Sequence, residues 1–425
     1  MKNVDISIQN ISKIEGHADL EVKVRKNKVE KVHIKFTENK RFFTQAIRKR
    51  SIDTLPQSVS RICGTCSIAH LLCCIEAIEK GLGITPSEQT RLLRKLTMYG
   101  LIIRDHALHL YLFSLPDVFN KDSVLDFDEN QHKYLLDAFA LKKAGNLLCT
   151  IIAGRAVHAP YPLVGGFAHF PSKEEIKSCV QELTKVRLRL FDALDVYYNA
   201  KIDYTRETDF LALARDEFDF LEGDLVSSHG LHIQEKEFPK HLQKVVLPYS
   251  QAVGYKFEGD TYMVGALARL NLNKKGLHKN TKKDAQKYLK IFPSNNIFHN
   301  NLAQGIEILH AIDHSIEIME SKTFKEEEPI AVIPKACEGV GLIEAPRGAL
   351  FYRLKMDKTG IILNGDIVVP TQQNQINMEL DIKNLVQKHI SKLSKEQITY
   401  EIEKLIRSYD PCISCASHFL KVNWV

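Results

Sequence analysis

Two Cys-x-x-Cys pairs stand near opposite ends of this chain, and they constrain its fold more than any other feature. The first pair is Cys63 and Cys66, the second is Cys412 and Cys415, and about 345 residues separate them. Paired cysteines at this spacing are typical of metal sites, because the short turn between them lets both sulfurs face one point. The sequence therefore predicts that the two ends of the chain meet at one four-thiolate site in the core.

Structural zinc is the simplest alternative for such a site. Zinc ribbons keep their pairs roughly 15 to 20 residues apart, because the metal holds together a small domain that lacks a core. A chain of 425 residues that is 44% hydrophobic buries a large core without such help. A thioredoxin-like dithiol is a second alternative, although neither pair follows a strand in a recognisable βαβ unit. Both alternatives stay open at this level.

Composition excludes several classes of function. The formal net charge of +6 comes from 58 basic and 52 acidic residues scattered along the chain, without a basic stripe suited to nucleic acid. The longest charge-free stretches, such as Ala144–Gly154, are far shorter than the roughly 20 apolar residues of a membrane span. No secretory signal is visible at the N-terminus. We expect a cytoplasmic protein with no nucleic-acid partner and no direct membrane span.

Periodicity indicates a mainly α fold with peripheral β-sheets (α+β). Alternating apolar residues at 20–24 and 32–36 flank Asn27 and predict a hairpin, and 350–356 and 361–369 predict a late strand pair. Apolar residues at helical spacing predict helices over 88–114, 174–200, 301–320 and 395–408. No repeat, linker or shift in composition marks a boundary, so we expect one interleaved domain over 1–425.

Each cysteine pair stands in a longer motif. Arg61–His70 has the pattern Arg-x-Cys-Gly-x-Cys-x-x-x-His, and Asp410–His418 has the pattern Asp-Pro-Cys-x-x-Cys-x-x-His. Both resemble the signatures of nickel-iron hydrogenase large (catalytic) subunits, in particular those of the soluble cytoplasmic multimeric type. Further segments resemble the family in its order, at 14–17, 154–158, 164–166, 344–348 and 368–371. The resemblance covers essentially the whole chain and implies the family's helical large-subunit core.

The resemblance also implies the cofactor and the reaction. All four cysteines would bind a nickel-iron centre, with carbon monoxide and cyanide ligands on iron. Cys63 and Cys412 would be terminal ligands of nickel, and Cys66 and Cys415 would bridge to iron. The activity implied is the reversible heterolytic cleavage of dihydrogen into protons and electrons.

Four further residues match family positions that act on dihydrogen or its protons. Arg347 matches the arginine held over the metals, and Asp117 and Asp410 match the carboxylates that pair with it. Glu15 matches the glutamate that relays protons from a terminal cysteine. Without the resemblance, these aspartates are read as surface or helix-capping carboxylates and Glu15 as a strand-edge glutamate bonded to backbone.

Other matches surround the metals. Pro346, Arg347, Pro370 and Thr371 match the pocket for the iron ligands, and His70 is expected to orient or shield a bridging cysteine rather than bind metal. His418 matches a histidine that, with a glutamate, holds a magnesium-type ion. Thr44 stands in place of that glutamate and supplies no carboxylate, which leaves the ion without an expected ligand. Residues 419–425 form a short tail where family members carry a processing peptide.

The remaining cysteines do not form an iron-sulfur motif and are predicted to be small buried hydrophobes: Cys73, Cys74, Cys149, Cys179 and Cys337. Electrons must therefore leave through a partner. The resemblance implies a small iron-sulfur subunit and further flavin, nicotinamide or ferredoxin modules. Two other functions stay open, a dihydrogen-sensing subunit and a structural-metal scaffold related to respiratory quinone-reductase subunits.

Overall fold

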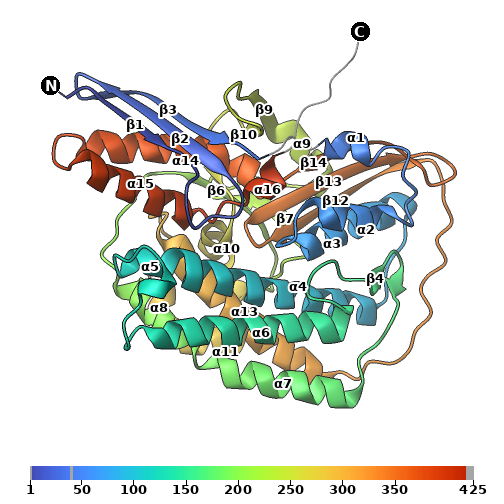
Figure 1. Ribbon diagram of the computed structural model, residues 1–425. Helices are drawn as coiled ribbons and strands as arrows, with labels where there is room; N and C mark the ends of the chain where they lie inside the picture. Colours follow the sequence, from blue (N-terminus) through green and yellow to red (C-terminus); the bar gives the residue numbers. More distant parts are fainter. Residues whose placement is uncertain (1, 39–41, 418–425) are drawn as a thin grey trace, which may run out of the picture.

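The computed structural model describes residues 2–38 and 42–417, and long helices form its largest layer (Figure 1). Four of them pack side by side: α4 (Glu88–Leu108), α6 (His132–Ala153), α7 (Lys173–Arg187) and α13 (His299–Ser321). Helices α4 and α6 approach closely because glycines face each other; a Cβ on Gly145 would lie 2.7 Å from the backbone nitrogen of Arg104. This close packing gives the functional side chains of α4 a rigid support.

The helices predicted over 301–320 and 395–408 are confirmed as α13 and α15 (Lys395–Ser408), and the one over 88–114 begins as α4. That segment changes at its end, where His109–Ser114 form a π-helix, η2, before α5 (Leu115–Val118). Pro116 has no backbone N–H, so regular α-helical bonding cannot continue through it. The helix predicted over 174–200 is two helices, α7 and α8 (Leu190–Asn199).

The predicted N-terminal hairpin is confirmed as β2 (Ala18–Arg25) and β3 (Lys28–Phe36), which form an antiparallel sheet with β1 (Val4–Ile8). Lys26 and Asn27 have φ angles of 50° and 63°, as a tight two-residue hairpin turn requires. The sheet packs against α14 (Pro370–His389).

The late strand pair is confirmed as β13 (Gly348–Met356) and β14 (Ile362–Val368). A third strand, β12 (Cys337–Ala345), was not predicted and pairs with β13 along its whole length. It lies against α3 (Ser67–Leu82) so closely that a Cβ on Gly339 would fall 1.9 Å from the carbonyl oxygen of Ala77. This packing holds the turn between β12 and β13 next to the start of α3.

The other elements are short. They are α1 (Phe43–Ala46), α2 (Leu55–Val59), η1 (Ser60–Ile62), η3 (Val124–Asp126), β4 (Pro162–Leu163), β5 (Gly166–Phe167), β6 (Asp209–Ala214), β7 (Asp224–Ser227), β8 (His232–Ile233), η4 (Glu235–Glu237), α9 (Phe238–His241), β9 (Leu242–Val246), β10 (Val253–Phe257), β11 (Tyr262–Met263), α10 (Ala266–Asn273), η5 (Lys274–Gly276), α11 (Lys279–Asp284), α12 (Gln286–Leu289) and α16 (Ile413–Ala416).

One large apolar cluster runs from Ile6 to Ala416 and includes all four paired cysteines. Cys73, Cys74, Cys149 and Cys179 are buried as predicted, and Cys337 is half-buried. The predicted mainly helical fold with peripheral sheets is confirmed. No helix within residues 2–38 and 42–417 has a stretch that is long and apolar enough to span a bilayer.

Candidate metal centre

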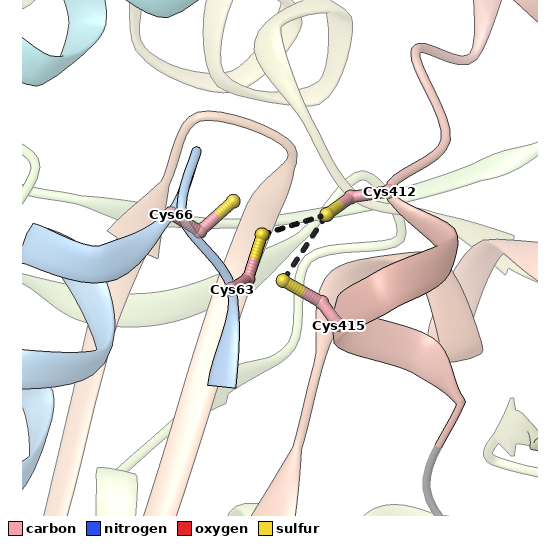
Figure 2. A group of neighbouring side chains, drawn as sticks. All are labelled: Cys63, Cys66, Cys412 and Cys415. Atoms are coloured by element: carbon pink, nitrogen blue, oxygen red, sulfur yellow. Dashed lines mark hydrogen bonds between the residues drawn. The ribbon is translucent and has the colours of Figure 1, made fainter. Parts of the chain in front are cut away.

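The four paired cysteines meet at one point (Figure 2). Cys63 follows η1 and Cys66 stands at the N-terminus of α3, while Cys412 precedes the short helix α16 that carries Cys415. Their side chains point toward one another from the two ends of the chain, and all four sulfurs lie within 4.8 Å of each other.

The four sulfurs are in contact without being bonded. The Sγ atom of Cys412 lies 3.4 Å from that of Cys63 and 3.1 Å from that of Cys415, and no disulfide joins them. The Thr65 hydroxyl lies 2.9 Å from the Cys63 sulfur. Four buried, unbonded thiols form a soft donor set that fits thiophilic ions such as nickel and iron.

Hydrogen bonding and burial change the acidity of the Cys63 and Cys412 thiols in opposite directions. The hydrogen bond between Cys63 and Cys412 holds the pKa of the Cys63 thiol well below its ordinary value. Burial raises the pKa of the Cys412 thiol well above its ordinary value. Metal binding must therefore displace the proton of Cys412.

Glu15 connects the N-terminal segment to the second cysteine pair. Its backbone carbonyl accepts a hydrogen bond from the Ile413 N–H at 2.8 Å. Its carboxylate accepts from the Cys412 thiol at 3.1 Å and from the Ser414 N–H at 3.0 Å. Burial raises the pKa of this carboxyl, and the charge of Cys63 adds to the rise.

Arg347 lies in the two-residue turn between β12 and β13. Its Nη1 atom is 3.5 Å from the Cys66 sulfur and donates to Asp105 at 2.8 Å, and its Nη2 donates to Asp410 at 2.9 Å. Burial alone would lower the pKa of this guanidinium, but the two carboxylates outweigh it and raise the pKa above its usual value. Arg347 is thus a fixed cation beside the sulfurs.

The predicted pairing of Asp117 with Arg347 is wrong. The Asp117 carboxylate accepts from Arg407 at 2.6 and 2.9 Å and from Lys13 at 2.7 Å. Its expected place is taken by Asp105 on α4, which sequence analysis missed. The available signal was an adjacent pair of opposite charges, Arg104 and Asp105, directly after the apolar run 101–103 of a helix. Asp117 and Asp410 are each 3% exposed, so neither is a surface carboxylate.

A small cavity with mainly apolar walls borders the sulfurs of Cys66, Cys412 and Cys415. Of the predicted pocket residues, Arg347, Pro370 and Thr371 line it. The Thr371 hydroxyl also accepts from the Cys412 N–H at 3.0 Å. The Pro346 carbonyl instead accepts from Arg269 at 2.9 Å.

His70 lies beside a sulfur, with its Nε2 atom 3.5 Å from Sγ of Cys415. Its Nδ1 atom is 2.7 Å from the hydroxyl of Tyr352, a contact that sequence analysis did not predict. Thr44 lies half-buried in α1. His418 and the tail 419–425 lie outside the described residues, so the magnesium-type ion and the processing peptide stay predictions.

The family model for nickel-dependent hydrogenase matches this chain over residues 41–146 and 227–418. The chain belongs to the nickel-dependent hydrogenase family. Within it, the chain is 30% identical to the sulfhydrogenase 2 subunit alpha of Pyrococcus furiosus over 422 residues, which cover 98% of this chain and 100% of the relative. The sulfhydrogenase 1 subunit alpha of the same organism is also 30% identical, over 435 residues, 99% of this chain and 100% of the relative.

Solved hydrogenase structures share the fold. An NAD+-reducing NiFe-hydrogenase in the H2-reduced state superposes with a TM-score of 0.84 at 21% identity, covering 98% of this chain and 99% of the other. The Ni-Fe-Se hydrogenase of D. vulgaris Hildenborough gives a TM-score of 0.79 at 21% identity, covering 98% and 100%. Because the chain belongs to the nickel-dependent hydrogenase family, it is an oxidoreductase subunit that acts on dihydrogen. Its buried four-cysteine cluster suits a nickel-iron site.

The geometry predicts which cysteines hold the metal. Changing Cys66 or Cys415 to serine replaces a soft ligand by a hard one and should remove most of the nickel, of which the parent enzyme should hold about one ion per chain. Cys74→Ser is the matched control, because Cys74 is equally buried in α3 but is not part of the four-sulfur cluster. Elemental analysis of the purified proteins measures the difference. Full nickel content in Cys66→Ser would contradict the assignment.

Proposed function

We propose that this chain, as one catalytic domain, performs the reversible heterolytic cleavage of dihydrogen and passes the electrons to a partner iron-sulfur subunit. One observation carries the proposal: two charged side chains contact the buried cluster of four thiols. The guanidinium of Arg347 lies 3.5 Å from the Cys66 sulfur, and the carboxyl of Glu15 lies 3.1 Å from the Cys412 sulfur. A cation and a proton acceptor on either side of the sulfurs are what heterolytic chemistry requires.

A bound nickel-iron centre, with carbon monoxide and cyanide on iron, supplies the position at which dihydrogen is polarised and split. Cys63 and Cys412 would be the terminal ligands of nickel, and Cys66 and Cys415 the bridging ones. The cavity beside Cys66 and Cys415 supports the placement of the iron ligands, because Pro370 gives it an apolar wall and Thr371 a hydroxyl.

Arg347 acts as a polarising cation in this proposal. The carboxylates of Asp105 and Asp410 hold both of its terminal nitrogens, and they raise its pKa. A guanidinium stabilised in this way keeps its proton, so it stabilises negative charge that develops beside Cys66 instead of accepting a proton.

Glu15 takes the proton away. A proton received by the sulfur of Cys412 lies within hydrogen-bond reach of the Glu15 carboxylate, at 3.1 Å. Because burial raises the pKa of this carboxyl, Glu15 accepts a proton more readily than an exposed glutamate does. His70, which contacts Cys415, orients that sulfur.

The partner would dock at the loop between Cys63 and Cys66, because this loop connects the four-cysteine cluster to the surface. Gly64 is exposed between Cys63 and Cys66, and Arg61 is exposed one turn earlier. Electrons tunnel over short distances only, so an iron-sulfur cluster of a small subunit belongs opposite this loop. The proposal includes further flavin, nicotinamide or ferredoxin modules and a cytoplasmic location. Of these, a nicotinamide module is the one in keeping with the NAD+-reducing hydrogenase that shares the fold.

Infrared spectroscopy and activity together test the proposal. The purified enzyme should show carbon monoxide and cyanide bands, and it should oxidise dihydrogen with an artificial electron acceptor. A dihydrogen sensor would show the same bands with very slow turnover. A structural-metal scaffold would show neither, and zinc as the only bound metal would refute the proposal.

Glu15→Gln tests the proton route. The amide keeps the shape of the carboxyl but carries no proton, so turnover should fall by about 10²-fold or more while the infrared bands persist. The control is Glu21→Gln on β2, whose carboxylate pairs with Lys31 and Lys35 on the sheet surface. Activity near that of the parent enzyme would show that protons leave by another path.

Arg347→Lys tests the polarising cation. A lysine keeps the charge but loses the fork that binds Asp105 and Asp410, so activity should fall by about 10²-fold with nickel and iron retained. Arg353→Lys, on the same hairpin and paired with Asp366 at the surface, is the control. Failure to incorporate metal, or unchanged activity, would show that Arg347 serves folding or is incidental.

A further inference from the structure

His109 is a buried histidine that the proposed mechanism does not use. It begins the π-helical segment η2 and is 1% exposed. Its Nε2 atom lies 2.8 Å from the backbone carbonyl oxygen of Arg407, and its Nδ1 atom lies 2.6 Å from the side-chain oxygen of Gln304. Both neighbours are carbonyl oxygens, which only accept hydrogen bonds. Each ring nitrogen must therefore carry a hydrogen, which makes the ring an imidazolium.

The orientation of the Gln304 amide supports this proton count. Its nitrogen donates to Oδ2 of Asp410 at 2.9 Å, and Oδ1 of the same carboxylate accepts from Arg347. Reversing the amide would give Gln304 a hydrogen to donate to His109 but would set its oxygen against the carboxylate. Asp410 thus determines which way Gln304 points, and Gln304 determines that Nδ1 is protonated.

The surroundings of the ring favour a cation. The carbonyl of Arg407 lies in the last turn of α15, where the helix dipole attracts positive charge. It also accepts from the Asp410 N–H at 2.9 Å. The Asp410 carboxylate lies 3.9 Å from Nε2. The guanidinium of Arg407 is bound by Asp117, so its charge is compensated on the other side of the helix end.

We propose that His109 is a positioning residue: a buried imidazolium that, through Gln304, holds the Asp410 carboxylate in the orientation that places Arg347 beside Cys66. These contacts form a continuous chain of hydrogen bonds, which runs from the Arg407 carbonyl through His109, Gln304 and Asp410 to Arg347. Asp410 needs such support because its φ of 50° is unusual for a residue other than glycine. The π-helix places His109 at the start of this chain of hydrogen bonds, as such segments often do at functional sites.

The inference rests on the role proposed above for Arg347, but its first test does not. Neutron crystallography of the complete, deuterium-exchanged hydrogenase complex at neutral pH should show deuterium on both ring nitrogens of His109 and the Gln304 amide nitrogen toward Asp410. A single deuteron on the ring, with the amide reversed, would overturn the proposal whatever Arg347 does.

Variants test the positioning role. His109→Gln removes the cation, and Gln304→Met interrupts the hydrogen bonds between His109 and Asp410. Each variant should retain nickel and iron but lower turnover by about 10- to 100-fold, the range typical of residues that orient the surroundings of a metal site. The control is His310→Gln, because His310 is equally buried in α13 and its nitrogens bond Tyr99 and His278. The control should match His109→Gln in thermal stability but retain activity.

A double variant separates positioning from a structural role. If His109 acts through Arg347, His109→Gln combined with Arg347→Lys should be no slower than Arg347→Lys alone. Losses that multiply would overturn the positioning role. Unchanged activity of Arg347→Lys alone would refute the proposed role of Arg347, while the neutron result would still decide the protonation of His109.

Discussion

The contact of four buried thiols from opposite ends of the chain is the constraint on which the rest of the structure depends. Thiolates repel one another, so this cluster is stable only where cations compensate it and the backbone holds it in place. The fold provides both. Arg347 stands 3.5 Å from Cys66, and the hydrogen bond from Ile413 to Glu15 joins the two ends of the chain. The site consequently exists only when the whole chain has folded.

Buried arginines with two or more acceptors form the frame around the site. Arg347 binds two carboxylates, Arg407 binds Asp117 in a fork, and Arg269 binds Glu307 and Glu344. An unpaired charge at such positions would cost several kcal/mol, so each pair fixes the relative position of the elements that carry it. Such a frame holds the guanidinium of Arg347 in place before the substrate arrives, which is the condition for electrostatic catalysis.

Local patterns predicted the elements whose stability is local. The hairpin at Asn27, the helices α13 and α15 and the strands β13 and β14 are visible in periodicity and turn residues. Strand β12 was missed because its glycines serve close packing against α3, a contact with no local signal. Asp105 was missed for a related reason. The π-helix after Leu108 changes the direction of the following side chains, so Asp117 faces α15 while Asp105 faces Arg347.

The sequence by itself determined the family and brought out the four cysteines as candidate metal ligands, because cysteine spacing and the motifs around it are local and specific. It also indicated Arg347, Glu15 and Asp410 as neighbours of that site through their motifs. Only the tertiary structure decided which carboxylate meets Arg347 and how His109 and Gln304 connect to Asp410. Those contacts join α4, α13, α15 and the β12–β13 turn, and packing between distant segments leaves no periodic trace in the residues themselves.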